Sequence, residues 1–127
     1  MLAALKARIA AQRGADAEKR AEAHLRQHGL KSVARNWRCP LGELDVVMAD
    51  GGTLVIVEVR ARTGASHGSA LESVTAGKRC KLARTALAFV QAHPQWQDAP
   101  LRFDVVHFEA DGRGHWLRDA FTGDDLA

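Results

Sequence analysis

The residues from Gly42 to Arg62 constrain the fold most, because they place a turn signal between two apolar runs. The turn is Asp50-Gly51-Gly52, in which glycine reaches positive φ without a steric cost. The run after the turn is rich in β-branched residues, which suit a pleated and buried surface. This stretch therefore predicts a β-hairpin, although charged side chains interrupt both of its runs.

The length of the turn decides which face of the hairpin those charges occupy. Suppose that Gly51-Gly52 forms the whole loop: Asp45 then lies directly opposite Glu58. In the same register Glu43 lies opposite Arg60, and all four side chains share one face. A three-residue loop would send Asp45 and Glu58 to opposite faces, since one step of register inverts a strand. We predict the two-residue loop.

Two carboxylates that face each other repel, so a cationic group is expected between them. It is a divalent metal ion, the guanidinium of Arg60, or a proton that Asp45 and Glu58 share. Oxygen ligands with no nearby cysteine or histidine favour Mg²⁺ or Mn²⁺ over zinc. The alternative is a structural salt-bridge cluster with Arg60 and Arg62, which on the hairpin alone is slightly the better account.

Composition narrows the class of protein. A chain of 127 residues with 46% hydrophobic side chains is expected to form one domain with its own core. The formal net charge of +3 only mildly favours a polyanionic partner. Cys39 and Cys80 lack the CxxC spacing, so a structural zinc site or a disulfide framework is disfavoured. No run approaches membrane-spanning length and no signal peptide is recognised, so we expect a soluble cytoplasmic protein with no membrane partner.

The first helix carries a further acidic candidate. We expect residues 1–13 to be a lead-in segment that breaks at Arg13-Gly14, residues 14–122 to form the domain, and residues 123–127 to be a frayed tail. A helix is predicted from Asp16 to His28, closed by Gly29. Glu18 falls on the edge of its apolar stripe, either paired with neighbouring charges or as a third acidic group near the hairpin carboxylates.

The remaining pattern predicts three more strands and a second long helix, with basic residues on several of these elements. Lys78 falls on the inward stripe of that helix, and its other basic residues form either a solvated surface or a patch that follows phosphates. The predicted elements are a basic strand at Leu30–Cys39, a mobile loop at Thr63–Ser69, a helix from Leu71 or Thr75 to His93, and strands at Leu101–Glu109 and His115–Arg118.

This order of elements resembles the αβββαβ core of the PD-(D/E)xK nuclease superfamily, which includes Holliday-junction resolvases and restriction-type endonucleases. More closely, the chain resembles the YraN-like family of small bacterial proteins. The resemblance implies an α/β, restriction-endonuclease-like fold in which helices flank a central mixed sheet. The matching pieces are Arg35-Asn36-Trp37-Arg38, Gly42-Glu43-Leu44-Asp45, Val57-Glu58-Val59-Arg60-Ala61-Arg62, Lys78 and Arg102-Phe103-Asp104-Val105-Val106.

The resemblance also implies roles for single residues. Asp45 and Glu58 match the two metal-binding acids, and Glu18 matches the acidic residue of the first helix. Arg60 stands where nucleases of this superfamily usually carry lysine. Because arginine stays protonated, Arg60 would stabilise the pentavalent phosphate and not act as a base. Lys78 is the candidate for the missing lysine.

Three functions are compatible with these residues. The first is a Mg²⁺- or Mn²⁺-dependent endonuclease, with DNA favoured over RNA and branched or repair intermediates as candidate substrates. The second is a nucleic-acid-binding module on the same fold that does not cut, and the third is a protein-interaction subunit. Resolvases act as dimers, which makes a homodimer one expected state. The side chains expected to hold the nucleic-acid backbone are Arg35, Arg38, Arg62, Lys78 and Lys81.

Overall fold

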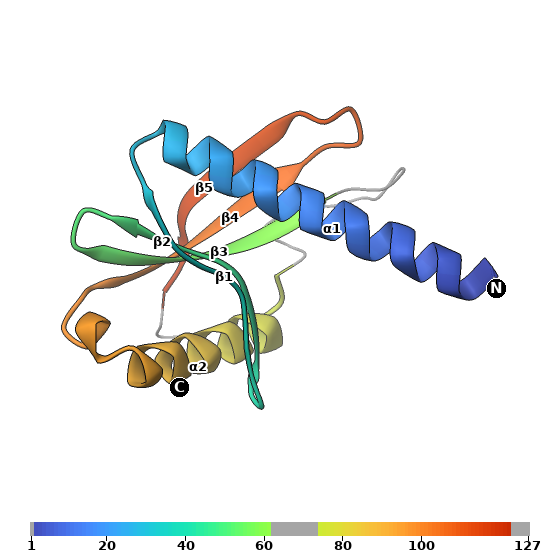
Figure 1. Cartoon of the computed structure of the whole chain (residues 1–127). Coiled ribbons are helices and arrows are strands. Elements are labelled where there is room, and N and C mark those ends of the chain that lie inside the picture. Colours follow the sequence, from blue (N-terminus) through green and yellow to red (C-terminus); the bar gives the residue numbers. More distant parts are fainter. Residues whose placement is uncertain (1, 62–73, 123–127) are drawn as a thin grey trace.

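The computed structural model describes residues 2–61 and 74–122 of the chain. These residues form two α-helices, five strands and one turn of 3₁₀-helix (Figure 1). In chain order the elements are α1 (Leu2–Gln27), β1 (Lys31–Cys39), β2 (Gly42–Asp50), β3 (Thr53–Ala61), α2 (Ala76–Ala92), η1 (Pro94–Trp96), β4 (Leu101–Phe108) and β5 (Gly114–Phe121).

The strands form one mixed sheet in the order β1-β2-β3-β4-β5. Strands β3 and β4 run parallel, and every other neighbouring pair is antiparallel. The parallel pair needs a crossover, and α2 lies within it. Helix α1 covers one face of the sheet and α2 covers the other (Figure 1). The predicted α/β architecture with helices on both sides of a mixed sheet is confirmed.

Each face of the sheet has its own hydrophobic layer, because successive residues of a strand point to opposite sides. The layer towards α2 includes Val47, Leu54, Ile56, Leu82, Phe89 and Phe103. The layer towards α1 includes Ala21, Leu25, Val46, Met48, Val55 and Val57. Both faces of β2 and β3 are therefore buried over most of their length, which explains the nearly continuous apolar runs of the hairpin.

The register of the β2–β3 hairpin is the predicted one. Asp50 pairs with Thr53 and Val47 pairs with Ile56 across the two-residue loop. Gly51 has φ 59°, the conformation for which the turn requires glycine. The three-residue alternative is thereby excluded, and the paired register extends to Val46 and Val57, the chain neighbours of Asp45 and Glu58.

The sequence placed some boundaries wrongly. The predicted break at Arg13-Gly14 is wrong, since α1 is continuous from Leu2 to Gln27 and its N-terminal part extends past the sheet (Figure 1). One glycine costs a helix only about 1 kcal/mol relative to alanine, so it does not by itself end one. The last strand reaches Phe121, which is buried and stacks on Phe103 with 4.9 Å between ring centroids. The predicted loop at Thr63–Ser69 and the predicted tail lie outside the described residues.

Candidate active site

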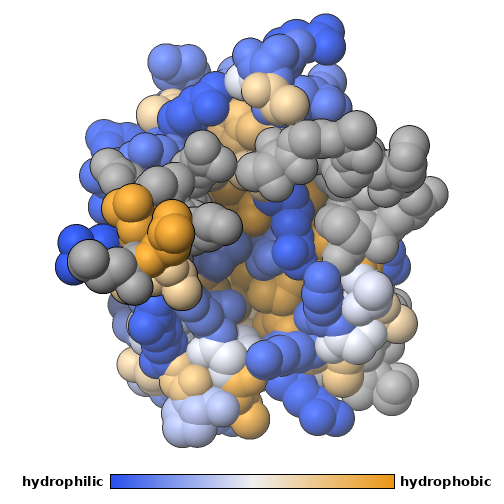
Figure 2. All heavy atoms as spheres, turned by 90° about the vertical axis from the view of Figure 1, so that its right-hand side faces the viewer, coloured by the Kyte–Doolittle hydropathy of each residue, from blue (hydrophilic) through white to orange (hydrophobic). Residues whose placement is uncertain are grey.

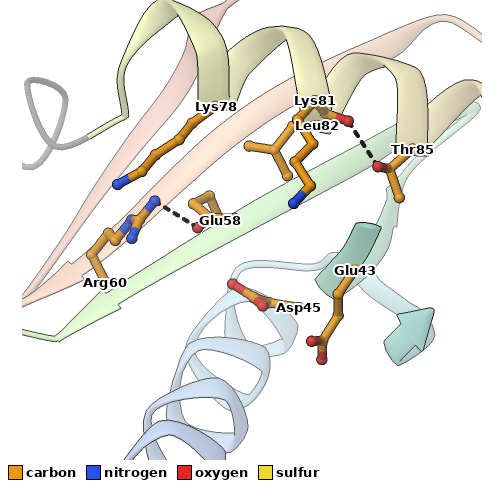
Figure 3. Close-up of a pocket in the computed structure, with 8 residues that line it drawn as sticks. All are labelled: Glu43, Asp45, Glu58, Arg60, Lys78, Lys81, Leu82 and Thr85. Carbon is orange, nitrogen blue, oxygen red and sulfur yellow. Dashed lines mark hydrogen bonds and ion pairs between the residues drawn. The ribbon is translucent and has the colours of Figure 1, made fainter. Parts of the chain in front are cut away.

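The predicted carboxylates line a pocket of about 250 Å³ between the sheet and the first half of α2. The pocket lies where β3 ends and α2 begins, and the molecular face at this end is hollowed, with hydrophilic side chains around hydrophobic ones (Figure 2). Its lining is mostly charged (Figure 3). The residues are Glu43, Asp45, Glu58, Arg60, Lys78, Lys81, Leu82 and Thr85.

Asp45 and Glu58 both line this pocket, and they are close enough that the charge of Asp45 acts on Glu58. Burial and the negative charge of Asp45 raise the pKa of Glu58 to about 7. Burial also raises the pKa of Asp45. The backbone N–H of Val59 donates to Asp45 Oδ2 at 3.3 Å, and this hydrogen bond lowers the pKa and so offsets part of the rise. Because the two carboxylates repel each other, protonation of Glu58 relieves that repulsion at pH values below its raised pKa.

The guanidinium of Arg60 lies beside Glu58 and not between the two carboxyl groups (Figure 3). Its Nη2 is 3.0 Å from Glu58 Oε1. Its Nε is a buried donor with no acceptor within the described part of the chain. Arg60 thus neutralises part of the negative charge while one N–H group is left to donate elsewhere.

Helix α2 supplies the cationic wall of the pocket. The side chains of Lys78 and Lys81 both extend from the helix into the pocket; that of Lys81 points towards Asp45, and that of Lys78 points towards Arg60 (Figure 3). The charge of Lys78 lowers the pKa of Glu58, although burial and Asp45 outweigh it. The helix begins at this point because the side chain of Thr75 caps it, accepting from the backbone N–H of Lys78 at 3.3 Å.

Glu18 lies close to Asp45 but does not line the pocket. Burial is the main cause that raises the pKa of Glu18, followed by the charge of Asp45. The side chain of Asn36 on β1 hydrogen-bonds Glu18, which lowers the pKa of Glu18, and Asn36 has a φ of 55°. This role of Asn36 was not predicted; its signal was an asparagine inside a strand, since asparagine tolerates positive φ. Within residues 2–61 and 74–122, no three acidic, histidine or cysteine side chains are grouped to hold a metal ion by themselves.

The predicted phosphate-binding residues are only partly brought together. Lys78 and Lys81 line the pocket, whereas Arg35 and Arg38 on β1 do not. Arg35 Nη1 lies 3.8 Å from Glu22 Oε1 on α1, and Arg38 Nε lies 3.5 Å from Glu43 Oε2. Arg62 is outside the described residues.

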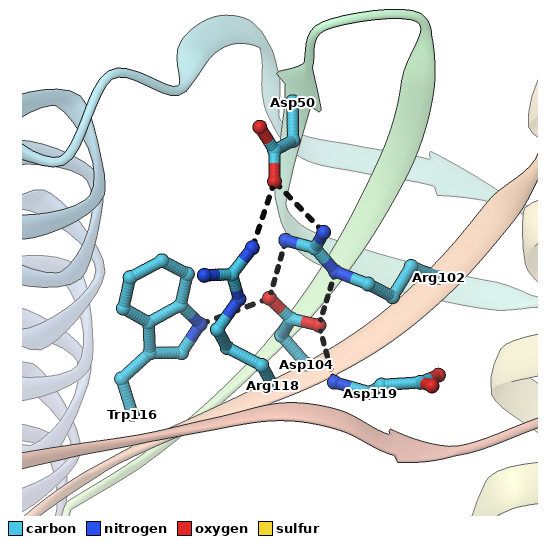
Figure 4. Close-up of polar contacts among 6 residues, drawn as sticks. All are labelled: Asp50, Arg102, Asp104, Trp116, Arg118 and Asp119. Carbon is cyan, nitrogen blue, oxygen red and sulfur yellow. Dashed lines mark hydrogen bonds and ion pairs between the residues drawn. The ribbon is translucent and has the colours of Figure 1, made fainter.

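A second polar cluster was not predicted from the sequence. Asp104 on β4 is fully buried and accepts two bonds from Arg102, one from the Trp116 indole and one from the backbone N–H of Asp119 (Figure 4). Arg102 also donates to Asp50 at 2.8 Å, as Arg118 does at 3.1 Å. The cluster connects β2, β4 and β5 and satisfies each oxygen of Asp104, which is the arrangement expected of a structural group.

Comparison with known proteins places the chain in a family. Residues 17–108 match the uncharacterised protein family UPF0102. The chain belongs to UPF0102. A UPF0102 protein of Pseudomonas fluorescens strain Pf-5 is 49% identical over 112 residues, covering 85% of this chain and 91% of the relative. A UPF0102 protein of Halorhodospira halophila is 50% identical over 111 residues, covering 87% of each chain. The resemblance to the YraN-like family is thereby confirmed. No helix among the described residues of this UPF0102 chain is long and apolar enough to cross a membrane.

The acidic pair makes stability depend on pH. Because the folded-state pKa of Glu58 is raised from 4.5 to about 7, its protonated form stabilises the fold below pH 4.5, and this contribution is lost as pH rises towards 7. We measure the free energy of unfolding of Glu58→Gln and of wild type by urea unfolding without divalent metal. The difference, variant minus wild type, should increase by about 3 kcal/mol from pH 4.5 to pH 8. The exposed Asp98→Asn serves as control and should show a flat difference. If the difference between Glu58→Gln and wild type did not change with pH, the pKa of Glu58 would not be raised in the folded protein.

Proposed function

We propose that this protein binds DNA and cleaves it as a Mg²⁺- or Mn²⁺-dependent endonuclease on a restriction-endonuclease-like αβββαβ core. The observation that carries the proposal is the pair Asp45 and Glu58, held face to face in a pocket whose other wall is cationic. A buried acidic pair is costly unless a cation joins it, and lysines on the opposite wall suit an anion. A divalent ion together with a phosphate satisfies both walls at once.

The donor set fits Mg²⁺. This ion is usually bound by one or two carboxylates and completes its shell with water and substrate phosphate. The pocket lining contains no histidine or cysteine, which disfavours zinc. Asp45 and Glu58 would hold the ion directly, and Glu18 would assist through water. When bound, the ion lowers the pKa of a coordinated water and draws charge from the scissile phosphate.

The cationic side chains have separate roles in this proposal. A guanidinium is a hydrogen-bond donor only, so Arg60 donates hydrogen bonds to the phosphate and does not act as a base. Its buried Nε, which has no acceptor within the described residues, supports that role. Lys81 holds the nucleic-acid backbone by charge, which gives binding that weakens with salt and little sequence preference.

Lys78 is the proposed replacement for the lysine that nucleases of this superfamily carry on the strand. Its side chain extends from the start of α2 into the pocket, where its charge acts on Glu58 (Figure 3). We expect Lys78→Met to lower the cleavage rate by about 10²-fold, because it removes a cation that stabilises transition-state charge. The cleavage rate of Lys78→Arg separates two roles of this side chain. If the rate is kept, the positive charge is what matters; if it falls as in Lys78→Met, Lys78 acts by transferring a proton, which arginine does not do. Unchanged cleavage by Lys78→Met would assign Lys78 to the helix surface.

The direct test is incubation of the protein with DNA in the presence of Mg²⁺ or Mn²⁺. Linear, flap and branched substrates of the same sequence should be compared, with EDTA as the metal-free control. Cleavage that requires the metal supports the proposal. Absence of cleavage on every substrate, or cleavage that EDTA leaves unchanged, would contradict it.

A second candidate is a nucleic-acid-binding module that does not cut. The ion pair between Arg60 and Glu58 at 3.0 Å favours it, because the arginine already neutralises one of the two acids. Such a module would bind DNA with the same affinity whether Mg²⁺ is present or absent, and raised salt would still weaken the binding. Binding titrations at two salt concentrations, each with and without Mg²⁺, separate the two candidates.

A further inference from the structure

The hairpin formed by β1 and β2 ends in an exposed apolar tip. Cys39 pairs with Gly42, so Pro40-Leu41 forms a two-residue turn. The side chain of Leu41 is 51% exposed, and Pro40 is exposed as well. The hairpin projects past α2 at one end of the molecule (Figure 1). Proline is common in turns, but a large apolar side chain such as that of Leu41 is not among the residues that dominate them.

The root of this hairpin is held firmly against α2. A Cβ atom at Gly42 would lie 2.9 Å from Thr85 Oγ1 and 3.1 Å from Lys81 Cε, so only glycine allows this close approach. Trp37 packs edge-on against Phe89, with 5.2 Å between ring centroids. The base of the β1–β2 hairpin is therefore packed against α2, and this packing holds the tip in position.

The hairpin links the tip directly to the candidate active site. Strand β2 begins at Gly42, next to Leu41, and Asp45 follows three residues later. At about 3.3 Å per residue, the tip is roughly 13 Å from the acidic pair along the strand. Stacked nucleotides rise about 3.4 Å per step, so a strand whose phosphate lies in the pocket would pass the tip within about four nucleotides.

The charges near the tip indicate its partner. Arg38, whose side chain is 77% exposed, lies on the same hairpin just before the turn. The stem of Lys81 lies over Gly42 at the other side. Glu43 lies 3.5 Å from Arg38 and offsets part of its charge, while Lys81 adds a second cation beside the tip. Apolar residues with cations nearby suit a nucleic acid, whose phosphates pair with the cations while its bases contact the apolar group. Leucine and proline are among the residues that proteins insert between base steps.

We propose that Pro40-Leu41 is a wedge that contacts unstacked bases next to the cleavage site, so that the preferred substrate is DNA with unpaired nucleotides beside a duplex. This inference rests on the proposed function, since it takes the phosphate to lie in the acidic pocket. The preference arises because opening a paired step costs free energy that an already unpaired step does not. Fully paired duplex is bound more weakly for the same reason.

The test compares Leu41→Ala with Leu87→Ala, a matched change at a leucine that is 43% exposed on α2. Binding is measured in EDTA, so that nothing is cut, to a fully paired duplex and to the same duplex carrying a single-stranded flap. 2-Aminopurine placed at successive positions beside the flap reports unstacking by its fluorescence. We expect wild type and Leu87→Ala to prefer the flap substrate and to raise the fluorescence within about four nucleotides of the branch. Leu41→Ala should lose about tenfold in flap affinity and the fluorescence change with it.

Equal flap preference and equal fluorescence for Leu41→Ala and wild type would overturn the wedge while leaving metal-dependent cleavage intact. A protein that forms dimers without DNA, and becomes monomeric on Leu41→Ala, would show that the tip binds a second copy, which also overturns it. Failure of the proposed function is a different result: wild type then binds no DNA, or Mg²⁺ added to the bound flap substrate produces no cleavage.

Discussion

Asp45→Asn is expected to reduce metal-dependent DNA cleavage by roughly 10²–10³-fold, because an amide oxygen holds a divalent ion much less firmly than a carboxylate does. The substitution keeps the size of the side chain and its acceptor for the Val59 N–H. Cleavage is measured under single-turnover conditions with Mn²⁺ on the substrate that wild type cuts best. A variant that keeps wild-type cleavage would exclude Asp45 from the metal site.

The same variant separates loss of function from loss of fold. Removing one of two buried acids relieves their repulsion, so Asp45→Asn should be at least as stable as wild type at pH 8 without metal. Mn²⁺ should raise the melting temperature of wild type and leave that of Asp45→Asn nearly unchanged, since an ion stabilises only a fold that binds it. Asp98→Asn, an exposed aspartate, provides the control for both measurements.

The register of the β2–β3 hairpin followed from local chemistry. The two glycines after Asp50 set the length of the loop, and a side-chain period of two then placed the paired residues from Val46 to Asp50 and from Thr53 to Val57. The second helix was predicted for a similar reason, because Pro94 and the apolar spacing before it are local signals. Sequence neighbours decide such features, so a single sequence reveals them.

The features that sequence reasoning missed depend on long-range contacts. The bond between Asn36 and Glu18 joins β1 to α1, and neither residue has a local reason to meet the other. The continuation of α1 through Gly14 was missed because a glycine weakens a helix without ending it. Arg35 and Arg38 do not line the pocket, and each lies near a glutamate, Glu22 and Glu43 respectively, which a count of basic residues does not reveal.

The Asp104 cluster has the same long-range character, and it leads to the largest expected loss of stability. Arg102→Met should lower the free energy of unfolding by about 3–5 kcal/mol, because it leaves a fully buried carboxylate without its charged partner. Methionine retains much of the arginine stem, so the loss reports the missing charge and hydrogen bonds more than missing volume. Urea unfolding at pH 7 measures it.

Two further variants decide how that loss arises. Arg118→Met removes the other arginine that bonds Asp50, but its side chain is mostly exposed, so we expect a loss below about 1 kcal/mol. The double variant Arg102→Met, Asp104→Asn removes the buried charge as well and should recover part of the stability, while the amide oxygen still accepts from the Trp116 indole. If Arg102→Met alone lost less than about 1 kcal/mol, water or another group would be compensating the charge of Asp104. The side chains of the cluster would then add little to the backbone pairing and hydrophobic layers that already hold β4 and β5 to the sheet.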